Sequence, residues 1–209
     1  LKRVWFSSGI HHHYACDKFE PGFSQEFLWK CMQELNDADL EFAKDETRED
    51  LRRKLFPVIF DASVMPKRVN QADGADLVVT SAANYYEGVT QAEAEDFYAR
   101  MKSPDTAEPV MYGLNSRLVK KNGCVQEETW KIGGMYSPAI EKIVYWLEKA
   151  ETVAENKQQQ EVIRMLIRFY QEGDLDLFDA YSILWVQDTA SQVDIVNGFI
   201  ETYGDPLGM

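Results

Sequence analysis

The sequence predicts an α+β fold, and three observations carry this prediction. Two runs near residues 110–120 and 124–132 flank Asn122-Gly123, which supplies the positive φ pair of a type I′ hairpin. Apolar residues recur at helical spacing through residues 138–186. An apolar content of 45%, with 12% aromatic residues, is typical of a globular chain with a substantial core.

The length of 209 residues suits one domain of good size or two small ones. We expect one incomplete mixed α+β lobe over residues 1–209. The nearest candidate for a seam is Gly133-Gly134, which separates a mixed part, 1–134, from a mainly helical part, 135–209.

The N-terminal third predicts helices separated by turns. Ser7-Ser8-Gly9 indicates a turn, and the histidines that follow are expected in a loop or a strand. Ser24 is a good N-cap for a helix near 25–36. Thr47 and Asp50 open a second helix, which Pro57 is expected to stop after Phe56.

Four further elements are expected before the hairpin. They are a strand at 57–64, a loop at 65–76, a strand at 77–80, and a helix at 91–102 that begins with the capping box Thr90–Glu93.

Three helices are expected after the hairpin. They are a helix at 138–155 with Ser137 as N-cap and Pro138 at its first position, a helix at 157–171 ended by Gly173, and a helix at 175–186. Their aromatic residues are interpreted as core packing.

The charge balance excludes several classes of partner. The chain has 22 basic and 35 acidic residues, a net charge of −13, which disfavours nucleic acid and anionic membranes. Three widely spaced cysteines indicate neither a disulfide framework nor a zinc ribbon, and reduced thiols fit a cytoplasmic location. The chain begins at Leu1 without an initiator Met or a signal peptide, and we expect it to be a piece of a longer protein.

All three histidines, His11, His12 and His13, are consecutive, with Cys16 and Asp17 nearby. This cluster raises the alternative of a metal-binding protein. Because consecutive side chains diverge in both helices and strands, at most two of the histidines could share an ion. We therefore expect no metal ligands in this chain.

Residues near the C-terminus place a carboxylate close to a phenol. Glu201 and Tyr203 are two positions apart, so on an extended backbone they point to the same side. Such a pair can hold an ammonium group and donate to a carbonyl. On spacing alone, an ordinary edge strand ending at the Pro206 turn remains the alternative.

The segment Gly198–Pro206, with the order Gly-Phe-Ile-Glu-Thr-Tyr-Gly-Asp-Pro, resembles the signature of the dipeptidyl peptidase III family of zinc exopeptidases. Four other stretches are similar to segments of that family. They are Lys18-Phe19-Glu20-Pro21, Tyr86-Glu87-Gly88, Leu147-Glu148-Lys149-Ala150 and Leu184-Trp185-Val186-Gln187-Asp188.

This resemblance implies a two-lobed peptidase that removes dipeptides from the N-termini of oligopeptides. One lobe carries zinc on an HExxGH motif, and the other has helices packed around a small antiparallel, barrel-like sheet. The chain resembles the second lobe, because its sequence has no HExxGH. Zinc is therefore expected in the parent protein, outside this chain, with the zinc-binding lobe and an oligopeptide as partners.

The resemblance also implies roles for three residues. Glu201 matches the glutamate that holds the substrate ammonium, and Tyr203 matches a tyrosine at the scissile carbonyl, a catalytic role. Tyr14 matches an aromatic residue that lines the substrate subsites.

The sequence therefore predicts the substrate-binding lobe of a zinc-dependent dipeptidyl peptidase, inactive by itself. The alternatives are a non-catalytic peptide-binding module and the metal-binding protein of the histidine cluster.

Overall fold

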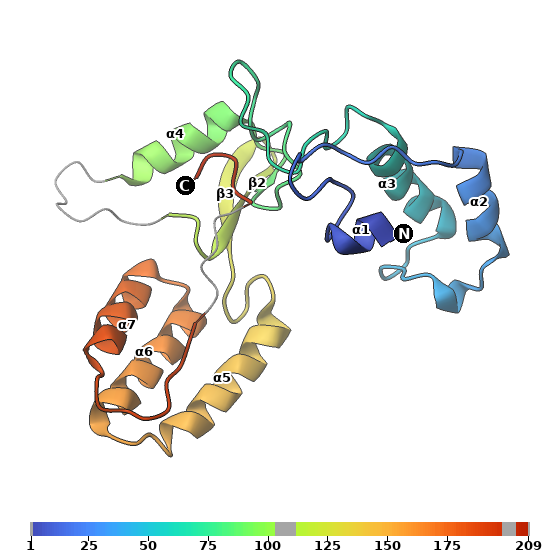
Figure 1. The fold of residues 1–209 in the computed structure, drawn as a ribbon. Coiled ribbons are helices and arrows are strands. Elements are labelled where there is room, and N and C mark those ends of the chain that lie inside the picture. The colour runs from blue at the N-terminus through green and yellow to red at the C-terminus, as the bar shows by residue number, and fades with distance from the viewer. Residues whose placement is uncertain (1, 103–111, 198–203, 209) are drawn as a thin grey trace. The chain divides into compact units, whose positions relative to one another are not determined.

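The computed structural model describes residues 2–102, 112–197 and 204–208, which form two compact units, 1–83 and 84–209. Within these residues the fold is α+β, with seven α-helices, one 3₁₀ turn and one small sheet (Figure 1). The α+β prediction is confirmed. The predicted sub-division at Gly133-Gly134 stays a prediction.

The described part of the first unit consists of three α-helices, one 3₁₀ turn and the loops between them. It contains α1 (Lys2–Phe6), α2 (Gln25–Glu34), the 3₁₀ turn η1 (Asp37–Asp39) and α3 (Arg48–Phe60). Ser24 caps α2 as predicted, accepting from the amide of Phe27 at 3.2 Å. The other end of α2 is capped by the Arg48 guanidinium, which donates to the carbonyls of Met32, Gln33 and Leu35.

Helix α3 begins as predicted but does not end as predicted. Thr47 and Asp50 form a capping box, yet the helix runs through Pro57 to Phe60, so the strand expected at 57–64 is wrong. The exposed Pro57 removes one backbone hydrogen bond. The extra turn places the Phe60 ring against Phe23 and Phe56, at 5.9 and 5.4 Å between ring centroids, and this aromatic packing offsets the loss.

The loop at 65–76 is confirmed, but residues 77–80 form a turn rather than a strand. The cause is Asp76, whose side chain accepts from the amides of Val78 and Val79. Its carbonyl accepts from the amide of Thr80 at 3.1 Å. This local capping satisfies backbone groups that a strand would have used.

The second unit contains the sheet. Strand β1 (Tyr86–Glu87) runs parallel to β2 (Ser116–Lys121), which pairs antiparallel with β3 (Cys124–Thr129) in the order β1-β2-β3. The hairpin is confirmed, and Asn122 and Gly123 have φ values of 51° and 80°. The prediction of an antiparallel barrel needs correction, because the described sheet is mixed and its three strands do not close.

Four helices accompany this sheet. Helix α4 (Gln91–Met101), with its predicted capping box, packs on β3. The other three are α5 (Ser137–Glu151), α6 (Lys157–Glu172) and α7 (Leu175–Gln187). Helix α6 lies between α5 and α7 (Figure 1) and supplies most of the larger core cluster.

Two details of the helical part differ from the predictions. The N-cap of α5 is Tyr136, with φ 61°, rather than Ser137, and α5 ends at Glu151 rather than 155. Ser137 Oγ instead accepts from the amide of Gly133 at 2.8 Å and donates to Glu141. It therefore links the segment after the hairpin to the first turns of α5. Gly173 ends α6 in the left-handed region, as predicted.

Within the described residues, no helix has the length and apolar character needed to cross a bilayer.

Candidate functional site

The three predicted site residues are not brought together in the described part of the chain. Glu201 and Tyr203 lie outside the described residues. Tyr14 lies in the first unit, in a turn where the amide of His12 donates to the carbonyl of Asp17 and the amide of Cys16 donates to the carbonyl of His12. Its side chain is 94% exposed, with the ring edge-on to His13. The binding roles of all three residues stay predictions.

Residues 204–208, which we call the C-terminal flank, include the last three residues of the signature and are attached to the sheet and α4. Tyr86, on β1, donates its hydroxyl to Asp205 Oδ1 at 2.8 Å, and the same oxygen accepts from the amide of Leu207 at 3.0 Å. Pro206 is buried, and Leu207 packs against the smaller core cluster of Val89, Ala94, Tyr98 and Leu118. Polar and apolar contacts therefore hold this flank together.

The Tyr86 hydroxyl stays protonated over the physiological range. Burial first, and then the Asp205 carboxylate, raise the pKa of Tyr86 well above its usual value. The phenol therefore keeps its proton and remains a hydrogen-bond donor to the carboxylate.

The N-terminal flank of the signature, residues 188–197, is attached to the three-helix part. Glu155, in the turn between α5 and α6, accepts from the amides of Gln192 and Val193 at 2.9 and 2.8 Å. Gln159 donates to the carbonyl of Val193 at 2.7 Å, and the Tyr170 hydroxyl bonds to Asn197 Oδ1 at 3.1 Å.

Further contacts support this flank. Asn156 donates to Ser191 Oγ at 3.0 Å, and the Trp185 indole donates to Asp194 at 2.8 Å. Asp188 accepts from the hydroxyl and amide of Ser191, and the hydroxyl hydrogen bond is the largest cause that lowers the pKa of Asp188. The carboxylate therefore stays charged at neutral pH, as this turn requires.

The three consecutive histidines have separate surroundings. His11 is buried and its Nε2 lies 2.8 Å from the carbonyl of Met65. The His12 ring packs edge-on against Phe19, and the His13 ring against Tyr14. Because the three imidazoles have different partners, they do not fit one shared ion. Among the described residues, no group of three or more His, Cys, Asp or Glu side chains could hold a metal.

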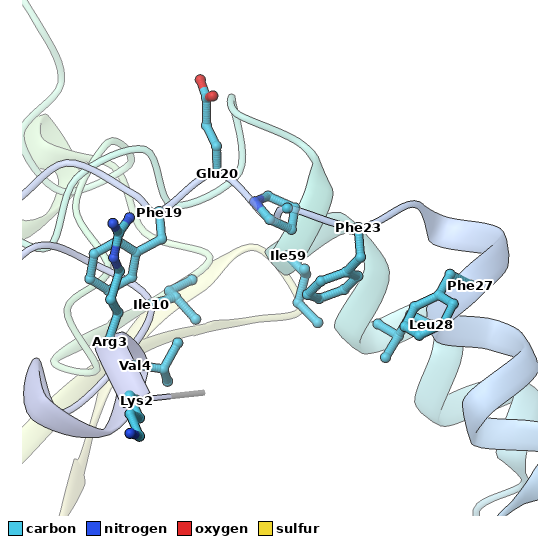
Figure 2. A pocket seen from close by; sticks show the side chains of 12 residues that line it. Lys2, Arg3, Val4, Ile10, Phe19, Glu20, Phe23, Phe27, Leu28 and Ile59 are labelled. Atoms are coloured by element: carbon cyan, nitrogen blue, oxygen red, sulfur yellow. The ribbon is translucent and has the colours of Figure 1, made fainter.

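The first unit also contains an apolar cavity of about 810 Å³ (Figure 2). Its wall includes Phe19, Phe23, Phe27 and Ile59, with the charged Lys2, Arg3 and Glu20 also at its lining. Tyr14 does not line it. The volume of this cavity is typical of ligand sites, but the predicted site residues are not among the residues that line it.

Sequence reasoning missed the residues that hold the two flanks. Tyr86 and Asp205 both stand in stretches that resemble family segments, yet their hydrogen bond joins positions 119 residues apart. Glu155 carried no signal at all, because an acidic residue in a turn between helices is usually solvated.

Comparison with known proteins supports the resemblance. The sequence model of peptidase family M49 matches residues 80–209, more than half of the chain. Dipeptidyl peptidase 3 of Rattus norvegicus and of Mus musculus are each 35% identical to this chain over 75 residues, and dipeptidyl peptidase 3 of Homo sapiens is 36% identical.

These 75 residues make up 36% of this chain and 10% of each relative. The matched part therefore spans about a tenth of the length of the curated relatives. The family match is broader and includes the sheet, the three-helix part and both flanks of the signature. On this ground, the chain belongs to peptidase family M49.

Proposed function

We propose that this chain is the substrate-binding part of a zinc-dependent dipeptidyl peptidase, which removes dipeptides from the N-termini of oligopeptides. The observation that carries the proposal is the family match over residues 80–209, which includes Glu201 and Tyr203. The name of the three relatives, dipeptidyl peptidase 3, supports the dipeptidyl specificity.

The proposed chemistry divides between two side chains. Glu201 holds the free ammonium of the substrate in a charge-assisted hydrogen bond, so that the scissile bond lies a fixed distance from the N-terminus. Tyr203 donates to the scissile carbonyl, where negative charge develops during attack by water. Tyr14 contributes an aromatic surface for substrate side chains.

Zinc would activate the attacking water and polarise the carbonyl in the parent protein. The residues of this chain do not fit that ion, because the sequence lacks HExxGH and its three histidines have separate partners. We therefore place zinc outside this chain. The isolated chain should not hydrolyse peptides, and zinc-dependent release of dipeptides by the purified chain would contradict this.

Calorimetric titration of the 209-residue chain with a short peptide tests the ammonium site. A peptide with a free N-terminus should bind, and the same peptide with an acetylated N-terminus should bind about tenfold more weakly or worse, because acetylation removes the charge. Glu201→Gln should abolish that preference, whereas Glu148→Gln, at an exposed position on α5, should keep it. Equal binding of both peptides would refute the proposal.

Kinetics of the intact parent enzyme separate the two roles. Glu201→Gln should raise KM sharply, because it weakens the substrate's ammonium contact. Tyr203→Phe should lower kcat by about a hundredfold, the order found when one oxyanion donor is removed. A parent that binds free-amino peptides but releases no dipeptide would instead indicate a non-catalytic peptide-binding module.

A further inference from the structure

We propose that Glu155 and Asp205 are positioning residues, which hold the two flanks of the segment that carries Glu201 and Tyr203 and thereby set its affinity for the substrate's N-terminus. The effect of Glu155 and Asp205 on the affinity for the substrate's N-terminus rests on the proposed function. The attachment of the flanks is a property of the fold and has its own test.

The Glu155 side chain binds two consecutive backbone amides, and we call this arrangement the Glu155 clamp. Both carboxylate oxygens are used, one by the amide of Val193 and one by the amide of Gln192. Gln159, only 7% exposed, binds the carbonyl of Val193 from the adjacent turn of α6. The backbone of Val193 is thus held through both its N–H and its C=O groups.

Apolar packing holds this flank at Ile195, which is partly buried against the larger core cluster. The Val193 side chain is 69% exposed, and Val196 is exposed as well. The two exposed valines gain little from the hydrophobic effect, so the rest of the attachment comes from polar contacts. Hydrogen bonds to carboxylates are the strongest class among these contacts, and Glu155 accepts two of them from the backbone of the flank.

The Asp205 contact holds the other flank by a different route. Its Oδ1 joins the Tyr86 hydroxyl of β1 to the amide of Leu207, so the carboxylate links the sheet to the turn at the end of the signature. The side chain of Leu207 then packs on the core cluster around Ala94 and Leu118.

Six residues, 198–203, connect these two attached flanks. A binding residue contributes most when its backbone is already ordered, because the ligand then does not have to supply that ordering. Loosening either flank should therefore weaken substrate binding even though neither Glu155 nor Asp205 touches the substrate in our assignment.

The first experiment measures amide hydrogen exchange, which needs no ligand. Glu155→Gln leaves one of the two amides without its acceptor, so exchange at residues 192–197 should accelerate about tenfold, the loss expected for a hydrogen bond to a charged group. Glu151→Gln is the matched control, because Glu151 at the end of α5 binds Arg164 instead. Equal exchange in the two variants would overturn the Glu155 clamp.

The Asp205 clamp is tested in the same way. Tyr86→Phe and Asp205→Ala should each accelerate exchange at residues 204–208, and the double variant should add little to either one. Asp205→Asn keeps an acceptor oxygen and should restore most of the protection. Tyr112→Phe is the control, since Tyr112 packs against the same core cluster but donates its hydroxyl to the carbonyl of Met101. Protection that is unchanged in Asp205→Ala would overturn this clamp.

The second experiment connects the clamps to binding. In titrations with the free-amino peptide, Glu155→Gln and Asp205→Ala should each weaken binding about tenfold, with thermal unfolding midpoints close to those of their controls. Loosened flanks with unchanged affinity would overturn the positioning role and leave the proposed function intact. If the wild-type chain does not distinguish free from acetylated peptide, the proposed function and the positioning role fail, while the exchange result still decides the clamps.

Discussion

Gly134 shows how the absence of one methyl group fixes the junction between the hairpin and α5. A Cβ atom at this position would lie 2.3 Å from the carbonyl oxygen of Thr129. That carbonyl already accepts from the amide of Met135 at 3.2 Å, and the amide of Gly134 donates to Lys131 at 2.9 Å. The chain therefore passes its own backbone at a distance that only glycine allows.

Gly134→Ala should destabilise the second unit by about 2–4 kcal/mol, because the backbone must shift and give up these hydrogen bonds. Chemical denaturation followed by circular dichroism measures the change. Gly204→Ala is the control, because a Cβ there meets the Tyr85 ring at an ordinary 3.6 Å. Equal stability of the two variants would show that the junction relaxes without cost.

At the scale of the element, the starts of α2, α3 and α4 and the hairpin turn were predictable, whereas the end of α3 and the short strand β1 were not. Ser24, Thr47, Thr90 and the Asn122-Gly123 turn act on their own neighbours, so their local chemistry is legible in the sequence. Helix α3 depends on aromatic partners from another segment, which override the usual effect of Pro57. β1 was missed because its two residues are paired by β2, 32 positions further on, and carry no strand pattern.

The capping box of α4 makes the stability of this helix depend on pH. The Lys120 ammonium, and then the amide and hydroxyl of Thr90, lower the pKa of Glu93 below its usual value of 4.5. A lowered carboxyl pKa stabilises the folded state above pH 4.5, and this contribution is lost as the pH falls through the folded pKa.

Thermal unfolding from about pH 6 to about pH 3 tests this dependence. Glu93→Gln should lower the midpoint near pH 6 and flatten its fall in acid, because the titrating group is gone. Glu95→Gln, at an exposed position on the same helix, should keep the slope of the wild-type protein. An unaltered slope in Glu93→Gln would contradict the assignment.

At the scale of the whole molecule, the apolar core is unevenly distributed between the two compact units. Both core clusters of the described residues belong to the second unit. In the described part of the first unit, the buried apolar side chains are Met32, Phe56 and Val78. Edge-on contacts between aromatic rings, such as Phe23 with Phe60 and Trp29 with Phe56, add to this packing. Buried apolar area is the main favourable term in folding, so the two units should differ in stability.

Regional hydrogen exchange in increasing urea should show residues 2–83 opening before the second unit. Helix α6 should be the last element to exchange, because it carries most of the larger cluster. Simultaneous opening of both units at one urea concentration would refute this order.

In the candidate site, residues within one short segment could be predicted from the sequence, whereas contacts between distant positions could not. Glu201, Tyr203 and Tyr14 were reached through a short signature and its resemblance to a family, and their roles remain proposals. The residues that hold the flanks were not reached, because Tyr86 with Asp205 and Glu155 with Val193 are contacts between distant positions. A composition or a spacing pattern contains no trace of such pairings.

The two attached flanks have a consequence for how this region can change in evolution. Between Asn197 and Asp205 the chain has a fixed number of residues, and both of these residues are held by contacts outside the segment, with Tyr170 and Tyr86 respectively. Substitutions there alter side chains only, whereas an inserted or deleted residue changes the contour length between two anchored points. Natural variation in this part of M49 peptidases should therefore accumulate as replacements, and length changes should be confined to turns such as Asn122-Gly123.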